Sequence, residues 1–135
     1  MRFVDTNVLL YAVSTDPAEQ SKSARANDLL DEVDLALSTQ VLQEFYVRAT
    51  RVTRAGPLSH RQAVDLVTAV GRYPVQPTTT QLVHSAMETQ RRFDISYWDA
   101  AIIETARLLR CDEVLSEDLS HGQDYEGVVV INPFR

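Results

Sequence analysis

Short, continuous apolar runs alternate along the chain with longer segments in which apolar residues recur every three or four positions. The short runs predict buried strands at residues 2–5, 35–38, 113–116 and 128–131. The longer segments predict helices at residues 7–14, 17–33, 40–54, 60–70, 80–93 and 97–109. Residues 73–77 are predicted to be extended, with room for a short strand, because each proline disfavours the helical conformation in the residue before it. This alternation favours an α/β fold with a mostly parallel sheet.

Polar residues and glycines mark the ends of several predicted helices. Asp16-Pro17 is a helix start, with Asp as the N-cap and Pro at the first helical position. Ser59 and Gln62 have the spacing of a capping box, and Ser96 is the expected cap of the last helix. Gly56-Pro57 is expected to end the helix that begins near residue 40.

Four acidic residues fall where predicted strands end or predicted helices begin. They are Asp5, Glu44, Asp99 and Asp118. Asp5 ends the first strand, Asp118 follows the strand that ends at Ser116, and Glu44 and Asp99 lie in the first two turns of helices. In an open parallel sheet, ligands bind just beyond the carboxyl ends of the strands, where the following helices begin. We therefore expect the four acids to converge in one crevice.

Three of these acids also have a purely structural interpretation. Asp5 or Asn7 can cap the helix that follows by accepting hydrogen bonds from its free N–H groups. Glu44 can be an ordinary solvated helix residue, although its neighbours on both sides are apolar and place it near the buried margin. Asp118 can be a turn residue, and Glu117 beside it is a rival for any role given to it.

Asp99 has a structural alternative of its own, because Ser96 and Asp99 match the Ser-x-x-Asp capping box. Its neighbours, however, are apolar, so we expect the first turn of this helix to be largely buried, with Trp98 in the core. A buried carboxylate needs a partner. No lysine or arginine nearby in the sequence suggests itself as that partner.

Four carboxylates in one crevice cannot all be ionised without compensation. Two like charges about 4 Å apart repel by roughly 4 kcal/mol at an effective dielectric constant of about 20, so either some groups protonate or cations enter. Oxygen ligands without cysteine or histidine suit hard cations such as Mg²⁺ or Mn²⁺. Such a site holds one ion, or two ions about 4 Å apart. This chemistry predicts hydrolysis of a phosphate ester by a metal-activated water.

Composition and charge narrow the function classes. The 135 residues are 44% apolar, which suits one domain with a real core. A net charge of −6 excludes a uniformly basic nucleic-acid binder but not a local basic patch. The only cysteine, Cys111, excludes an intrachain disulfide and an all-cysteine zinc site. The N-terminal apolar run is too short for a signal peptide or a membrane span, so a cytoplasmic protein is expected.

Short motifs around these residues, taken in order, are similar to those of a known family. The motifs are Val4-Asp5-Thr6-Asn7, Ser38 to Phe45 with its Glu44, Tyr97 to Ile102 with its Asp99, Leu115 to Leu119 followed by His121-Gly122, and Val130 to Phe134. Each motif is weak alone, but together they span the whole chain. The sequence resembles the PIN-domain ribonucleases, and within them the VapC-type toxins of bacterial toxin–antitoxin pairs.

The resemblance implies a three-layer α/β/α sandwich with a mostly parallel central sheet, formed by residues 1–135 as a single domain. It also implies an acidic active site with Mg²⁺ or Mn²⁺ as cofactor. The positions that match the family's acidic set are Asp5, Glu44, Asp99 and Asp118. Of these, Asp5 and Asp99 are the implied direct metal ligands. Asn7 and Ser116 match polar positions that orient the ligands or a water.

The resemblance also implies partners. Family members cleave single-stranded regions of RNA, often in tRNA or rRNA loops, form homodimers, and are silenced by a cognate antitoxin whose tail covers the pocket. Affinity for RNA comes mainly from phosphate contacts, for which Tyr97 or Trp98 could add base stacking. The candidate cations are Arg48, Arg51, Arg54, Arg61, Arg91 and Arg92. Arginines at helical spacing also suit a solvated face or an acidic antitoxin segment.

Other function classes fit less well. A haloacid-dehalogenase phosphatase needs a second Asp where Asn7 stands, and a lysine near the phosphate, whereas Lys22 falls in a predicted helix away from any strand end. A P-loop is absent. A catalytically silent PIN scaffold is the non-enzyme alternative, although a scaffold has no need of four uncompensated carboxylates. A metal-free ribonuclease using histidine would leave cyclic phosphates and act in EDTA, whereas the metal-dependent enzyme predicted here leaves 5′-phosphate ends.

Overall fold

Five parallel strands form the central sheet of the computed structural model, which describes residues 1–135. The strands are β1 (Arg2–Val4), β2 (Leu35–Ser38), β3 (Val75–Gln76), β4 (Glu113–Leu115) and β5 (Val129–Ile131), in the order β3-β2-β1-β4-β5. Phe3 of β1 pairs with Ala36 of β2 on one side and with Val114 of β4 on the other. All three residues are fully buried, as is usual in a parallel sheet covered on both faces.

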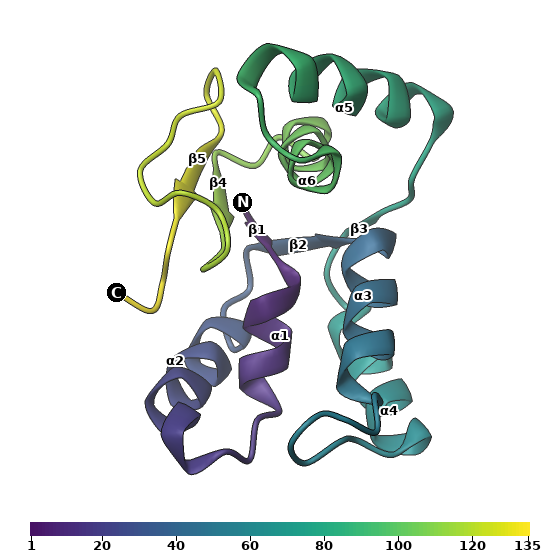
Figure 1. Ribbon diagram of the computed structural model, residues 1–135, viewed down its shortest axis with the longest axis vertical. Helices are drawn as coiled ribbons and strands as arrows, with labels where there is room; N and C mark the ends of the chain where they lie inside the picture. The colour runs from purple at the N-terminus through teal and green to yellow at the C-terminus, as the bar shows by residue number, and fades with distance from the viewer.

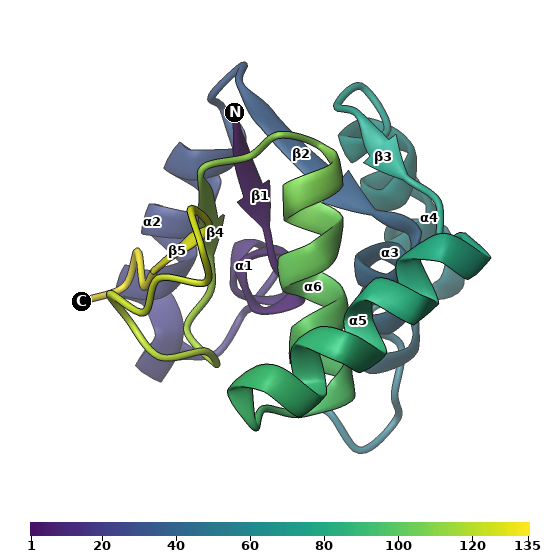
Figure 2. The ribbon, with the colours of Figure 1, turned by 90° about the horizontal axis from the view of Figure 1, so that it is seen from above.

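Helices cover both faces of the sheet (Figure 1). They are α1 (Thr6–Ala12), α2 (Gln20–Leu30), α3 (Thr39–Ala49), α4 (His60–Val70), α5 (Thr80–Phe93) and α6 (Tyr97–Leu108). The first four lie on one face, whereas α5 and α6 pack against each other on the opposite face, as Figure 2 shows from above. The predicted α/β class and the three-layer α/β/α sandwich are both confirmed.

The predicted helix at residues 40–54 ends early, at Ala49 of α3. The Thr50 hydroxyl donates a hydrogen bond back to the Tyr46 carbonyl, and the Leu58 N–H donates to the Ala49 carbonyl. These bonds satisfy carbonyl groups that a further helical turn would need. The segment that follows therefore crosses the surface as a loop before α4 begins.

The helix predicted at residues 17–33 is also shorter than expected. It begins with a 3-10 turn, Pro17–Glu19, and its α-helical part, α2, ends at Leu30. The Leu30 carbonyl accepts hydrogen bonds of 2.6 Å from both the Tyr73 hydroxyl and the Arg72 guanidinium. Because these side chains occupy the carbonyl, the chain leaves the helix there and turns into β2.

The strand order determines where a site can form. The chain that follows β1 runs through α1 and α2 to β2 on one side of β1, whereas the chain that follows β4 runs to β5, on the other side. The segments that follow β1 and β4 therefore diverge, which is the arrangement that forms ligand sites in open α/β sheets. A pocket lined by Asn7 and Asp118 opens at this point.

One apolar core of 27 buried residues joins the sheet to helices on both of its faces. Phe3, Leu9 and Phe45 are among its largest fully buried side chains, and they come from β1, α1 and α3. Burial of this apolar surface is the main force that holds the layers together. None of the helices combines the length and the apolar character needed to cross a bilayer.

We expect Phe45→Ala to lower the free energy of unfolding by about 3–5 kcal/mol, because the substitution leaves a cavity in the core. Val47→Ala on the same helix is the matched control, since the Val47 side chain is 55% exposed and surface substitutions usually change stability by within about 0.5 kcal/mol. Urea unfolding followed by circular dichroism measures both variants. Equal losses in the two variants would contradict the assignment of the core.

Candidate functional site

Asp5 lies at the carboxyl end of β1 and is only 6% exposed. Its Oδ1 atom accepts a hydrogen bond of 2.7 Å from the Thr6 N–H and caps α1. Its Oδ2 atom accepts a hydrogen bond of 2.7 Å from the hydroxyl of Ser116, which follows β4. The structural and the functional interpretations of Asp5 are therefore compatible, because one carboxylate oxygen caps the helix and the other faces the neighbouring strand end.

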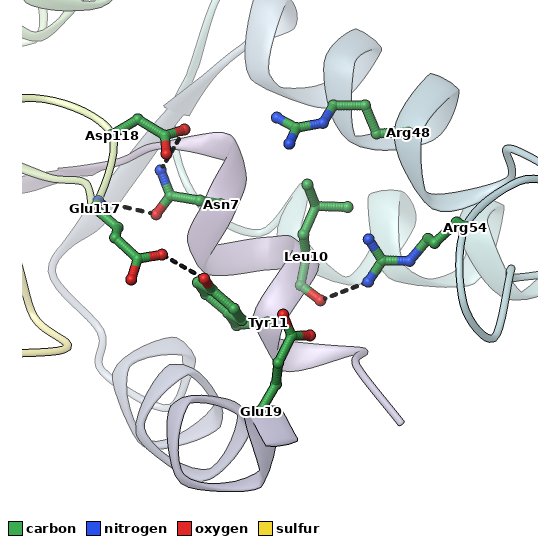
Figure 3. A pocket seen from close by; sticks show the side chains of 8 residues that line it. All are labelled: Asn7, Leu10, Tyr11, Glu19, Arg48, Arg54, Glu117 and Asp118. Atoms are coloured by element: carbon green, nitrogen blue, oxygen red, sulfur yellow. Dashed lines mark hydrogen bonds between the residues drawn. The ribbon is translucent and has the colours of Figure 1, made fainter. Parts of the chain in front are cut away.

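The Asn7 side chain connects the segments that follow β1 and β4. Its Nδ2 atom lies 3.2 Å from the Ser116 hydroxyl, 3.3 Å from Oδ2 of Asp118 and 3.4 Å from Oδ2 of Asp5. Its Oδ1 atom accepts a hydrogen bond from the Glu117 N–H, as Figure 3 shows. An amide has two N–H donors, so the three oxygens share them. Asn7 thereby holds two carboxylates close to each other.

Glu44 joins this region from α3. The hydroxyl of Thr6 donates a hydrogen bond of 2.9 Å to its Oε2 atom, and Nε2 of Gln40 donates one of 3.0 Å to Oε1. The start of α3 is fixed by Ser38, whose hydroxyl accepts from the Val41 N–H. Glu44 is thus half-buried and tethered to the first residue of α1 rather than free in solvent.

Asp99 enters from the opposite layer, in the first turn of α6. The Ser96 hydroxyl caps this helix by accepting a hydrogen bond of 3.0 Å from the Asp99 N–H, which is one half of the predicted capping box. The Asp99 side chain is half-buried and makes no hydrogen bond to the other three carboxylates. It interacts with two of them electrostatically, because the negative charges of Asp118 and Glu44 contribute to raising the pKa of Asp99.

The prediction that Trp98 lies in the core is wrong. Its side chain is 64% exposed, packs edge-on against the Tyr97 ring and borders a surface depression that it shares with Gln40 and Glu44. In the first turn of α6, the buried apolar side chains begin at Ala100. The hydrophobic run in the sequence therefore marked a helix with one buried face, and Trp98 occupies the other face, beside the acidic residues.

Burial and nearby negative charge make the carboxyl groups of Asp5 and Asp99 hard to ionise. Burial raises the pKa of Asp5 to about 6; hydrogen bonds from Ser116 and Thr6 oppose the rise, and the charges of Asp118 and Glu44 add to it. Burial also raises the pKa of Asp99, against the effect of Ser96 and with further contributions from Asp118 and Glu44. No arginine or lysine compensates either group. The structure thus brings the four predicted acids into one electrostatic cluster.

The donor set suits a hard divalent cation. Carboxylate, amide and hydroxyl oxygens surround the ends of β1 and β4, and neither cysteine nor histidine takes part in the hydrogen bonds of this cluster. In the protein alone, no three acidic, histidine or cysteine side chains are arranged around one point as metal ligands. The uncompensated charge is what a bound cation would neutralise. Metal ligation by Asp5 and Asp99 stays a prediction.

Lys22 lies closer to the cluster than predicted. Its ammonium group pairs with Glu117, two residues after the end of β4. The same group lies 3.3 Å from the Tyr11 hydroxyl, which also donates to Glu117. Burial raises the pKa of Glu117, but the hydrogen bonds from Lys22 and Tyr11 outweigh it and leave the pKa lowered. The expectation that Lys22 lies away from any strand end is wrong, because its long side chain reaches from α2 to the end of β4.

The predicted RNA-contacting arginines fall into two groups. Arg48 and Arg54 line the pocket beside Asn7 and Asp118, and Arg51 borders a shallow depression with Arg48 and Glu44. The arginines remote from this pocket are paired with acidic residues: Arg61 with Asp65, Arg91 with Glu88 and Arg92 with Glu126. The sequence could not separate the two groups, because all of these arginines are polar positions on helices or loops.

Two other contacts were not predicted. The hydroxyl of Thr6 binds Glu44, and Tyr11 binds Glu117. Thr6 belongs to the motif Val4-Asp5-Thr6-Asn7, so its position next to Asp5 was a usable signal. Tyr11 lies one turn further along α1 than Asn7, on the same side of the helix, which is also a signal of proximity.

The PIN domain family matches residues 2–122. This chain belongs to the PIN domain family. No curated protein matches the chain.

Solved structures share the fold of this PIN domain over nearly its whole length. A toxin–antitoxin complex from Klebsiella pneumoniae has a TM-score of 0.72 at 19% identity, with 98% of each chain covered. VapC20 from Mycobacterium tuberculosis, a sarcin–ricin loop cleaving toxin, has a TM-score of 0.67 at 23% identity, with 87% of this chain and 92% of that chain covered. FitAcB from Neisseria gonorrhoeae has a TM-score of 0.68 at 19% identity, with 99% of each chain covered.

The raised pKa of Asp5 has a consequence for stability. A carboxyl group whose pKa is 3.8 when exposed and about 6 when folded stabilises the fold fully only below about pH 4 and loses that contribution as the pH rises through 6. The difference corresponds to roughly 3 kcal/mol. In EDTA, we therefore expect the stability of the wild type relative to Asp5→Asn to fall by about this amount between pH 4 and pH 7.

Urea unfolding at several pH values measures this difference. Asp31→Asn is the matched control, since Asp31 is exposed at the end of α2, and its difference from the wild type should not follow the same curve. A wild type and Asp5→Asn pair with a constant difference across this pH range would mean that Asp5 ionises normally.

Proposed function

We propose that this PIN domain is a metal-dependent endoribonuclease and the toxin of a toxin–antitoxin pair. It hydrolyses phosphodiester bonds in single-stranded or loop regions of RNA, in the cytoplasm, with Mg²⁺ or Mn²⁺ as cofactor. The observation that carries the proposal is the buried carboxylate of Asp5. Its pKa is raised, the charges of Asp118 and Glu44 add to that rise, and no basic side chain compensates it. The family and its fold are consistent with this chemistry.

Each acid has a distinct part in the proposal. Asp5 and Asp99 would bind the metal directly, and Glu44 and Asp118 would complete the negative pocket. When bound, the cation supplies a Lewis acid and offsets the charge that develops on the phosphodiester. Asn7 keeps Asp5 and Asp118 at a fixed separation, which orients them for binding.

Ser116 supports the same arrangement from the end of β4. Its hydroxyl donates to Asp5 and accepts from the Asp118 N–H, so it sets the position of one acid relative to another. A hydroxyl that donates to a carboxylate also favours the ionised form. Ser116 therefore moderates the rise in the pKa of Asp5 that burial causes and helps to keep this acid available as a ligand.

The substrate side of the proposal rests on the cations and the aromatic rings around the pocket. Arg48 and Arg51 are the proposed phosphate contacts, and exposed Trp98 beside Glu44 is suited to stack on an unpaired base. Arg91 and Arg92, which the sequence also suggested as RNA contacts, pair with Glu88 and Glu126 away from the pocket and are not part of this proposal. The similarity to VapC20, a sarcin–ricin loop cleaving toxin, supports an RNA loop as substrate. The protein would thus act on structured RNA such as tRNA or rRNA at positions where bases are unpaired.

The proposed partners are a cognate antitoxin and a second copy of the chain. Similarity to a toxin–antitoxin complex from Klebsiella pneumoniae, and to VapBC2 of Rickettsia felis, supports the antitoxin. The homodimer follows from the family resemblance alone. The antitoxin would act by covering the acidic pocket, which is the part of the molecule that the chemistry requires to be open.

We expect Asp5→Asn and Asp99→Asn each to reduce RNA cleavage by at least about a hundredfold while the fold survives, because each removes a metal ligand. Asp65→Asn is the matched control, since Asp65 pairs with Arg61 on the exposed surface of α4. Cleavage of total RNA is measured with Mg²⁺ and with Mn²⁺, and circular dichroism checks the fold.

The products distinguish the remaining alternatives. The proposal expects 5′-phosphate ends and no cleavage in EDTA. Cyclic phosphate ends together with activity in EDTA would favour a metal-free ribonuclease. An intact fold that binds an antitoxin but cuts no RNA under any metal condition would favour a catalytically silent scaffold.

A further inference from the structure

The pocket beside the acidic cluster has two walls of opposite charge. It has a volume of about 130 Å³ and shares Asn7 and Asp118 with the cluster. Glu117 and Asp118 lie on one side, Arg48 and Arg54 lie on the other, and Glu19 lies between them at the lower edge of the view (Figure 3). Opposite charges at this proximity would ordinarily form ion pairs, but neither arginine pairs with any of these three acids.

The three carboxylates have other partners, which explains why the arginines stay unpaired. Glu117 binds Lys22 and Tyr11, Glu19 accepts a hydrogen bond of 2.6 Å from the Ser14 hydroxyl, and Asp118 accepts from Asn7. The acidic wall is therefore already engaged within the protein. The positive charge of the opposite wall remains available to a ligand from outside.

The two arginines are held differently, but both have free donors. Arg54 is half-buried and uses Nη2 to bind the Leu10 carbonyl at 3.2 Å, while its Nε atom is buried without a partner. Arg48 is exposed in the last turn of α3, whereas Arg54 lies in the loop that follows this helix. The Arg48 side chain points across the pocket (Figure 3). A guanidinium has five N–H donors, so most of those in this pair are unused by the protein. Buried donors without partners are rare in native structures.

We propose that Arg48 and Arg54 form a subsite for a phosphate of the RNA strand next to the one that is cut. The proposal rests on the ribonuclease function proposed above. Arginine matches phosphate oxygens in geometry and charge, and the pocket has room for a phosphate group but not for a duplex. Because the subsite adjoins Asp118, a strand bound there runs directly into the acidic cluster. Arg91 and Arg92, paired with acids elsewhere on the surface, lie outside this subsite.

Binding to a short single-stranded RNA of mixed sequence tests the proposal, with Ca²⁺ in place of Mg²⁺ to limit cleavage and a gel to verify that the RNA stays intact. The variants are Arg48→Ala and Arg54→Gln, the latter because glutamine can still donate to the Leu10 carbonyl. We expect each to weaken binding about five- to tenfold at moderate salt. We also expect each to lower the slope of log Kd against log salt by about 0.7, the loss of one phosphate contact.

Arg91→Ala is the matched control and should leave the slope unchanged. Arg54→Lys keeps the charge and should keep most of the slope, which separates loss of a phosphate contact from loss of structure. Variants at Arg48 and Arg54 that both retain the wild-type slope would overturn the subsite. Unchanged RNA binding together with lost binding to an acidic peptide would assign the pair to an antitoxin segment and would also overturn it.

Steady-state cleavage locates the bound phosphate. A phosphate that is held equally in the ground state and the transition state contributes to KM and not to kcat. We therefore expect both variants to raise KM with kcat close to that of the wild type. Equal losses of kcat and kcat/KM would mean that the arginines bind the phosphate that is cut, which would contradict the proposed subsite. If the wild type neither bound nor cut RNA, both the proposed function and the subsite would be contradicted. If the variants had the KM and kcat of the wild type, only the subsite would be contradicted.

Discussion

The carboxylate of Asp5 is almost wholly withdrawn from water, although no cation in the protein stands beside it. Burying such a group costs free energy, and the surrounding structure offsets part of this cost with hydrogen bonds to the carboxylate. Its two oxygens accept hydrogen bonds from the Thr6 N–H and from Ser116, and Asn7 contributes a longer contact. The parallel sheet makes this possible because it brings the ends of β1 and β4 side by side.

The distribution of charge around this point follows a simple order. No basic side chain compensates the carboxylate of Asp5 at the end of β1. Glu117 forms an ion pair with Lys22. Arg91 and Arg92, away from the site, form ion pairs with surface acids. Arg48 and Arg54 interrupt this order, since they are close to the acids and unpaired. A protein with a net charge of −6 thereby presents both signs of charge at a single opening, which is what a site for a metal and a polyanion requires.

Local chemistry predicted much of the fold. Capping residues such as Ser59 and Ser96 and the short apolar runs have local causes, and the structure confirms the helices and strands that they mark. The early end of α2 could not be predicted in this way, because it depends on Tyr73, which is 43 positions distant. The exposure of Trp98 could not be predicted for a related reason. An apolar run shows that a helix has a buried face, but not which residues of the run lie outside that face.

The sequence indicated which acids form the candidate site, but not the hydrogen bonds and ion pairs that these acids make. Strand ends and helix starts indicated that Asp5, Glu44, Asp99 and Asp118 share one edge of the sheet. The hydrogen bond from Thr6 to Glu44 and the reach of Lys22 to Glu117 depend on side-chain direction across layers, which sequence spacing does not contain. Topology thus predicts which residues meet, and packing decides how they meet.

The link from Asn7 to Asp118 joins residues 111 positions apart. During translation, Asp5 and Asn7 leave the ribosome long before Ser116 and Asp118 exist, so a nascent chain that stops before β4 carries only part of the acidic pocket. Under the ribonuclease function proposed above, such an incomplete chain would not cut the RNA around it. The proposed activity would arise only once β4 and Asp118 have been made, when the proposed antitoxin can already be present to bind the chain.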